Sequence, residues 1–70
     1  MGLNKLDLNL LKTFVGVAEE ESFTRAAKKL FIEQSAVSKA IKRLEVEIGA
    51  TLFLRTKRRV QLTTKGAGLL

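Results

Sequence analysis

The chain has 70 residues, of which 46% are hydrophobic and 29% charged, and this composition suits one small globular domain with a marginal core. It contains no cysteine, no histidine and no Gly-rich phosphate loop, so we expect no disulfide, no bound metal or cofactor and no enzymatic site. The lack of a long apolar run predicts a cytoplasmic location. The net charge of +6 arises entirely within residues 34–70, and such a basic half suggests a polyanionic partner, above all nucleic acid.

Residues 8–20 are predicted to form the first helix, with Asp7 as its N-cap. Apolar residues recur there at helical spacing, which predicts a stripe that faces the core. The stripe consists of Leu8, Leu11, Phe14, Val15 and Ala18, widened by Leu10 and Val17. We expect this helix to end at the three consecutive glutamates of residues 19–21, because negative charge is unfavourable at the C-terminal end of a helix dipole.

A short second helix is predicted over residues 23–30, and either Ser22 or Thr24 is its N-cap. Its inner face consists of Phe23, Ala26, Ala27 and Leu30. Residues 31–33 are too few for an independent loop and predict a tight turn into the next helix, although they lack the glycine often found in such turns. All four phenylalanines, Phe31 among them, are expected in the core rather than as platforms for stacked bases.

The third predicted helix spans residues 34–48 and ends at Gly49, a residue that suits a left-handed C-cap. One side is apolar, within an arc of roughly 60°. This predicted core face consists of Val37, Ile41, Leu44 and Ile48. The opposite side carries the short polar and basic side chains of Ser35, Ser38, Lys39 and Lys42. Such a division is typical of a helix that packs with one face and binds a partner with the other.

After Gly49 the apolar pattern changes from helical to alternating. Residues 53–56 and 60–63 are predicted as the two short strands of a hairpin, with the basic residues 57–59 as its turn. We expect four apolar residues to anchor this hairpin to the helices, namely Leu52, Phe53, Val60 and Leu62.

Together these elements predict a mainly α domain, a three-helix winged helix-turn-helix with a short two-stranded β wing, over residues 1–63. Residues 64–70 are expected to begin a further helix, capped by Thr63 or Thr64. A helix fits the major groove of B-DNA, where each base pair presents a distinct pattern of donors and acceptors. The arrangement therefore favours double-stranded DNA as the partner.

The expected contacts of the third helix begin at Gln34, whose amide can meet a phosphate beside the free N–H groups of the first turn. Ser35 and Ser38 can hydrogen-bond to bases or phosphates. Lys39 can reach guanine acceptors or a phosphate. These four residues are the candidates for contacts with base edges.

Contacts with the DNA backbone are expected from Lys42 and Arg43 and from the hairpin. The hairpin carries four cations in five residues, Arg55, Lys57, Arg58 and Arg59. An arginine from such a wing can enter a narrow, electronegative minor groove, while the other cations neutralise phosphates.

Three segments of the sequence then point to a family: SFTRAAKKL at 22–30, QSAVSKAIKRLE at 34–45 and LFLR at 52–55, followed by Gly66. In order and spacing they resemble the N-terminal domain of LysR-type transcriptional regulators, over essentially the whole chain. The resemblance implies a winged helix-turn-helix followed by a long linker helix, begun within residues 64–70, that pairs two subunits into a homodimer. It also implies a following C-terminal domain that senses a small-molecule inducer.

The resemblance also implies roles for particular residues. The family's recognition-helix contacts match Gln34, Ser35, Ser38 and Lys39. Arg55 matches the wing arginine of the minor groove, and Thr24 matches a position near a phosphate. Three residues depart from the pattern: Glu33 replaces a common Ser or Thr, Leu54 replaces a common polar residue, and Lys39 replaces a common Arg, which pairs better with guanine. These departures bear on the target sequence rather than on the fold.

Other functions fit the sequence less well. An enzyme would lack histidine and cysteine, and Glu45 and Glu47 do not share a helix face. A basic helical module that binds membranes or proteins is an alternative, although each apolar helix face is needed for the core. RNA binding is disfavoured, because the chain has no Tyr or Trp on which single-stranded bases could stack.

Overall fold

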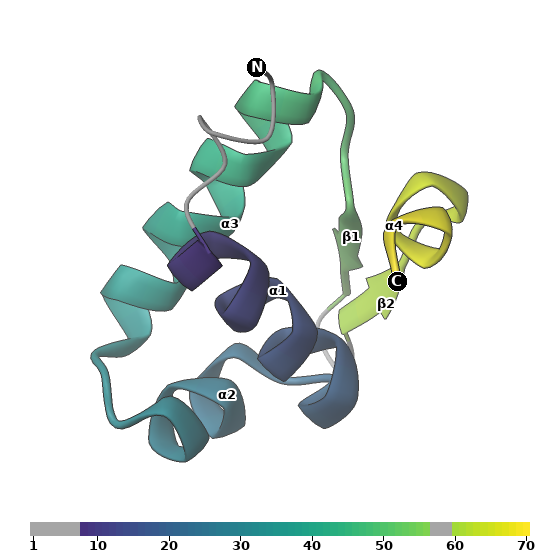
Figure 1. Cartoon of the computed structure of the whole chain (residues 1–70). Coiled ribbons are helices and arrows are strands. Elements are labelled where there is room, and N and C mark those ends of the chain that lie inside the picture. Colours follow the sequence, from purple (N-terminus) through teal and green to yellow (C-terminus); the bar gives the residue numbers. More distant parts are fainter. Residues whose placement is uncertain (1–7, 57–59) are drawn as a thin grey trace.

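The computed structural model describes residues 8–56 and 60–70, and these form three packed helices, a projecting hairpin and a short fourth helix (Figure 1). In chain order the elements are α1 (Leu8–Glu20), α2 (Phe23–Leu30), α3 (Gln34–Ile48), β1 (Phe53–Arg55), β2 (Val60–Leu62) and α4 (Thr64–Leu69). The first three helices have the predicted bounds, and each strand is one residue shorter than predicted. The mainly α, three-helix fold with a short β wing is confirmed. Asp7, the predicted N-cap of α1, and residues 57–59, the predicted hairpin turn, lie outside the described residues.

The predicted apolar stripe of α1 was wrong at two of its seven residues, and the other five are buried or pack against the core. Leu8 and Val15, which belong to that stripe, are 73% and 39% exposed. The residues that α1 buries are Leu10, Thr13, Phe14, Gly16 and Val17. Thr13 lies in the middle of this buried face, and because threonine is polar the apolar spacing does not reveal this part of the face. Its burial is tolerated because its hydroxyl donates to the carbonyl of Asn9 at 2.8 Å.

The core lies where the three long helices meet the base of the hairpin. Its largest fully buried side chains are those of Phe14, Ile41, Leu44, Leu52, Val17 and Val37. The ring of Phe53, from β1, lies between two helical rings, with its centroid 5.3 Å from that of Phe14 and 6.2 Å from that of Phe23. Leu52 and Phe53 are buried, and Val60 and Leu62 pack against the same cluster, so the predicted anchoring of the hairpin is confirmed.

The turn between α2 and α3 has a phenylalanine where a glycine is often found. Phe31 adopts a left-handed backbone with φ of 59°. The N–H groups of Phe31 and Ile32 donate to the carbonyls of Lys28 and Ala27 at 3.3 and 3.0 Å, which closes the end of α2. In this conformation the Phe31 side chain is 93% exposed, so its predicted place in the core was wrong.

An ion pair joins the ends of α1 and α2. The Nζ atom of Lys29 lies 2.6 Å from Oε1 of Glu19 and 3.6 Å from Oε2 of Glu20. The side-chain hydrogen bond to Glu19 raises the pKa of Lys29 above its usual value. The lysine is therefore charged at neutral pH, and because all three side chains are solvated the pair adds little to stability.

The hairpin is antiparallel, with Phe53 opposite Leu62 and Arg55 opposite Val60. α4 begins against the base of this hairpin, where Thr63 is its N-cap. The Thr63 hydroxyl accepts from the N–H of Gly66 at 3.0 Å and donates to the carbonyl of Thr51 at 2.6 Å. Thr63 thereby fixes the first turn of α4 to the loop that precedes β1.

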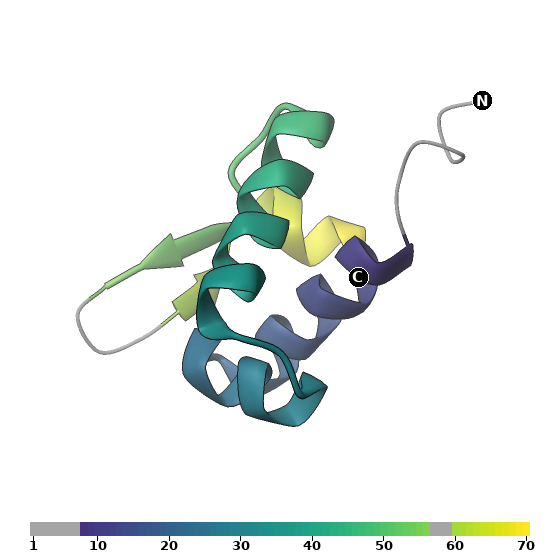
Figure 2. The same cartoon turned by 90° about the vertical axis from the view of Figure 1, so that its left-hand side faces the viewer.

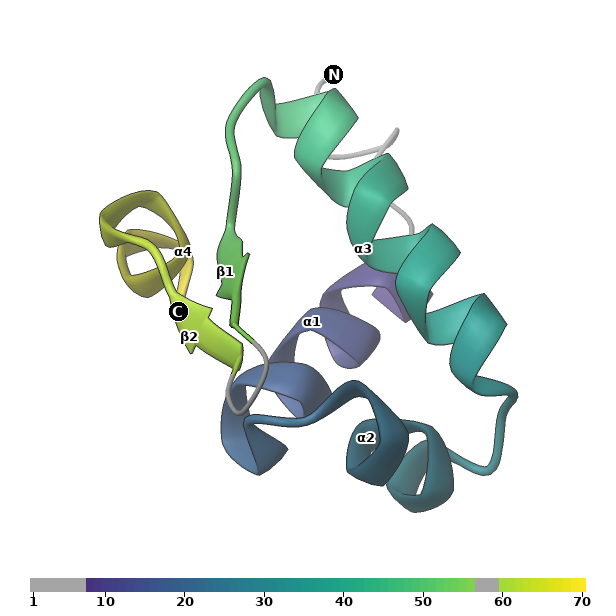
Figure 3. The same ribbon diagram turned by 180° about the vertical axis from the view of Figure 1, so that it is seen from behind.

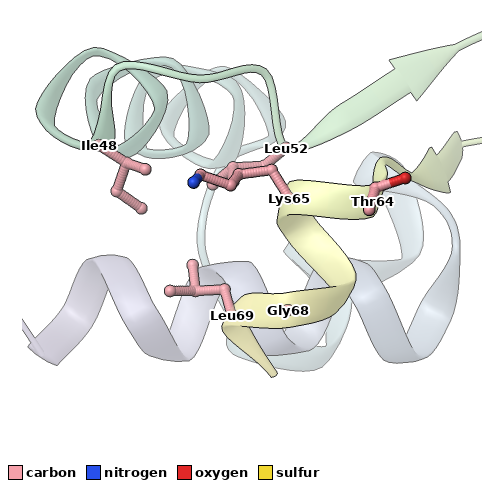
Figure 4. Close-up of a pocket in the computed structure, with 6 residues that line it drawn as sticks. All are labelled: Ile48, Leu52, Thr64, Lys65, Gly68 and Leu69. Carbon is pink, nitrogen blue, oxygen red and sulfur yellow. The ribbon is translucent and has the colours of Figure 1, made fainter.

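Seen from behind, α3 occupies one side of the molecule and the hairpin with α4 the other, with α1 between them and α2 below (Figure 3). An open apolar groove of about 550 Å³ lies between the end of α3 and α4 (Figure 4). It is lined by Ile48, Leu52, Thr64, Lys65, Gly68 and Leu69. None of the helices in the described part of the chain combines the length and apolarity that crossing a bilayer requires.

Candidate nucleic-acid interface

The structure divides α3 into a buried side and a solvated side, as its sequence predicts. Val37, Ile41 and Leu44 are buried in the core. The candidate contact residues all lie outside the core, and only Ser38 among them is half-buried: Gln34, Ser35, Ser38, Lys39, Lys42 and Arg43. α3 runs across one face of the molecule, and the hairpin projects from beside it (Figure 2). A helix and a hairpin that protrude in this way can reach two separate grooves of a duplex.

The starts of α2 and α3 are joined by a hydrogen bond between two candidate residues. Ser22 caps α2, since its Oγ accepts from the N–H of Arg25 at 3.1 Å, which leaves Thr24 free for another role. The hydroxyl of Thr24 donates to Oε1 of Gln34 at 3.2 Å. Because the amide oxygen of Gln34 is engaged in this way, its amide N–H groups are the part left to donate to a phosphate or a base.

A shared groove brings the outward side of α3 and the hairpin into one surface. The groove has a volume of about 480 Å³ and is lined by Ser38, Lys39, Lys42, Glu45, Phe53 and Arg55. Four of these six are predicted contact residues, and they come from two elements separated by a loop. Gln34, Ser35 and Arg43 lie outside the groove. Lys57, Arg58 and Arg59 are outside the described residues.

Arg55 lies at the rim of this groove above the aromatic part of the core. Its Cζ atom is 4.0 Å from the centroid of the Phe23 ring, in the position of a cation–π contact. Arg55 itself is exposed. Its charge therefore faces solvent while its side chain is held in place by an aromatic surface.

Glu45 is a structural residue of this surface whose role the sequence did not reveal. Its Oε2 atom accepts hydrogen bonds from the backbone N–H groups of Leu52 and Phe53, at 2.8 and 3.3 Å. These bonds fix the first strand of the hairpin to α3. A single glutamate on a helix predicts no such partner, because the accepting and donating groups lie seven and eight residues apart across a turn.

Replacing Glu45 with alanine is expected to reduce the free energy of unfolding by about 1 kcal/mol, because two backbone donors in a half-buried site lose their acceptor. Glutamine, whose amide oxygen still accepts, is expected to lose about half as much. Urea unfolding followed by circular dichroism measures both. The control is Glu47→Ala, an exposed residue of the same helix. A Glu45→Ala variant as stable as Glu47→Ala would show that the two bonds add nothing.

The sequence and the fold have clear relatives. The family model described as "Bacterial regulatory helix-turn-helix protein, lysR family" matches residues 8–67. The chain is 48% identical over 64 residues to the HTH-type transcriptional regulator PtxR of Pseudomonas aeruginosa. The matched part is 91% of this chain and 20% of PtxR, so the chain spans about a fifth of that relative.

Solved structures are also similar to this chain in sequence and in fold. A mutant of OxyR from Corynebacterium glutamicum, bound to H₂O₂, is similar with a TM-score of 0.92 and 41% identity, over 94% of this chain and 20% of that one. The BenM DNA-binding domain in complex with catB site 1 DNA is similar with a TM-score of 0.87 and 44% identity, over 90% of this chain and 71% of that one. The second of these relatives carries the same fold on a duplex.

Proposed function

Because the chain belongs to the lysR family of bacterial helix-turn-helix regulatory proteins, we propose that it binds double-stranded DNA sequence-specifically and thereby controls transcription. The observation on which this rests is the groove that α3 and the hairpin share, where Ser38, Lys39 and Lys42 face the same space as Arg55. Its likeness to the BenM domain bound to DNA supports the proposal. Such a function also implies action in the cytoplasm, where bacterial DNA lies.

In this proposal α3 lies in the major groove. Lys39 and Ser38 reach base edges, because they are at the middle of the solvated side and border the groove. Lys42 and Arg43, further along the helix, contact phosphates. Gln34, oriented by Thr24, donates to a phosphate beside the N-terminus of α3.

The wing, residues 55–59, lies at the minor groove and the DNA backbone. Arg55 is the residue that enters the minor groove, where a narrow A·T-rich tract concentrates negative potential. Lys57, Arg58 and Arg59 neutralise phosphates on either side of it. The exposure of Arg55 at the rim of the groove supports this assignment.

Residues 1–63 are in this proposal the DNA-binding domain, and residues 64–70 begin a linker helix that pairs two subunits into a homodimer. The apolar groove beside α4, with Ile48 and Leu69 on its walls, gives a pairing helix an apolar surface (Figure 4). In this proposal a small-molecule inducer binds to a C-terminal domain that follows the linker helix, as the resemblance to LysR-type regulators implies.

Selection of duplexes from a random pool by this domain, at one fixed salt concentration, tests the proposal. Sequence-specific binding predicts that one motif is enriched over successive rounds. Selected duplex, added to ¹⁵N-labelled protein, should then shift the amide signals of residues 34–43. A pool without an enriched motif, together with binding to anionic liposomes, would instead support a basic module for membrane surfaces.

Replacing Lys42 with alanine is expected to weaken binding to all duplexes by a similar factor, because phosphates are present in every sequence. The slope of log affinity against log salt concentration should fall by about one unit, since one fewer phosphate is neutralised. Fluorescence anisotropy across a range of salt measures it on a selected and a random duplex. Lys65→Ala, which removes the same charge from the groove beside α4, is the control and should leave the slope unchanged. A salt-dependence slope in Lys42→Ala equal to that of the native protein would contradict the phosphate contact.

A further inference from the structure

The aromatic part of the core continues to the surface and ends at a cation. The ring of Phe14 lies 5.3 Å from that of Phe53, and the ring of Phe53 lies 6.2 Å from that of Phe23 in an edge-to-face arrangement at 74°. The guanidinium of Arg55 completes this series, 4.0 Å from the centroid of Phe23. The last ring is therefore held by the core on one side and offers its face to Arg55 on the other.

The backbone of β1 places this arginine over that ring. Side chains alternate along a strand, so Phe53 and Arg55 share one face, and Leu54 lies on the other, 55% exposed. Phe23 is only 6% exposed and is the first residue of α2, so its ring has little freedom to move. An immobile ring beneath a long, flexible side chain restricts the positions that the side chain explores.

The contact leaves the positive charge of Arg55 available. Within residues 8–56 and 60–70 no carboxylate forms an ion pair with Arg55, since the ion pairs of that part of the chain are those of Lys29. Glu45 lines the same groove, but one of its carboxylate oxygens accepts from the backbone of the hairpin. An aromatic face orients a guanidinium without neutralising it, whereas a carboxylate would compete with DNA for it.

We propose that Phe23 is a positioning residue for DNA binding: in the free protein its ring holds the guanidinium of Arg55 at the rim of the groove, in the orientation in which it enters the minor groove. The inference rests on the proposed DNA-binding function. Its physical basis is that ordering a long side chain before binding removes a cost that would otherwise be subtracted from the affinity.

Phe23→Leu keeps an apolar side chain and removes the aromatic face. We expect it to bind the selected duplex about two- to ten-fold more weakly, the range that corresponds to the cost of ordering one long side chain on binding. In the free protein, the Nε–Hε signal of Arg55 should lose the upfield ring-current shift that a guanidinium above an aromatic face shows. Phe14→Leu is the control: it removes another ring of the series but none beside a cation, and folded protein of this variant should keep both the affinity and the Arg55 signal.

A double-mutant cycle with Arg55→Gln separates positioning from structure. If Phe23 acts through Arg55, Phe23→Leu weakens binding in the native background and has no further effect in Arg55→Gln. An equal loss of affinity in both backgrounds would overturn the inference. So would an Arg55 signal that stays at its native chemical shift in Phe23→Leu. Should Arg55→Gln bind as the native chain does, the proposed role of the wing fails instead, so the two failures are distinguishable.

A second substitution covers the case in which Phe23→Leu does not fold. Phenylalanine with three ring fluorines at position 23 keeps the shape of the ring and weakens its attraction for cations. The affinity for DNA should then fall while the melting temperature stays within a few degrees of the native one. Unchanged affinity in this folded variant would overturn the inference.

Discussion

Replacing Lys39 with alanine is expected to weaken binding to the selected duplex by about 1–3 kcal/mol and to flatten discrimination between sequences. Lys39 lies at the middle of the solvated side of α3 and borders the groove that the hairpin shares, and in the proposed complex it reaches base edges as well as phosphates. Dissociation constants for the selected duplex and for each of its single-base variants, at one salt concentration, measure the effect. The loss should be concentrated at one or two base pairs.

Two comparisons make this result specific. Ser38→Ala, on the same part of α3, should also relax sequence preference, whereas Lys42→Ala should lower affinity for all duplexes alike. If Lys39→Ala weakens the selected and the random duplex by the same factor, then Lys39 contacts only the DNA backbone. Base contacts of the domain would in that case come from other residues of the helix.

Replacing Gly66 with alanine is expected to reduce the free energy of unfolding by about 2–3 kcal/mol, because no space exists for a methyl group. A Cβ atom at Gly66 would lie 2.4 Å from the carbonyl oxygen of Leu52 and 2.9 Å from Cδ2 of Leu62. That carbonyl cannot move freely, since it accepts from the N–H of Thr63 at 2.9 Å. For a domain of this size the melting temperature should fall by roughly 8–20 °C, which differential scanning calorimetry measures.

Gly68→Ala is the matched control for that substitution. It lies in the same helix, and a Cβ atom there would meet nothing within 4 Å. We expect it to leave the melting temperature unchanged or to raise it slightly, since alanine favours a helix by up to about 1 kcal/mol over glycine. Equal melting temperatures for the two variants would contradict the close approach of α4 to the hairpin.

The bounds of the helices could be predicted from the sequence because their signals are local. Gly49 takes the left-handed C-cap, with φ of 79°, and Ser22 caps α2 from the position next to its first residue. The buried side of α1 could be predicted only in part. Two overlapping sets of apolar residues have helical spacing in α1, and both contain Phe14. Only packing against α2 and α3 selects the set without Leu8.

The candidate interface, too, could be predicted in part from local spacing. The solvated side of α3 follows from the helical period alone, and so does the place of Lys39 on it. The contacts that organise the interface join residues far apart in the chain, such as Thr24 with Gln34 and Phe23 with Arg55. Neither pair follows from spacing, because each depends on how α2 packs against its neighbours.

The carboxylate of Glu45, which joins α3 to β1, has a consequence for the target sites. It fixes the start of β1 to α3, so the protein fold sets the distance between α3 and Arg55. Each base pair inserted between two contact points moves them apart by about 3.4 Å and rotates one against the other by roughly 35°. In the proposed complex a fixed distance cannot follow such a change, so we expect the spacing between the base pairs contacted by α3 and the tract contacted by Arg55 to be part of the sequence that the domain recognises.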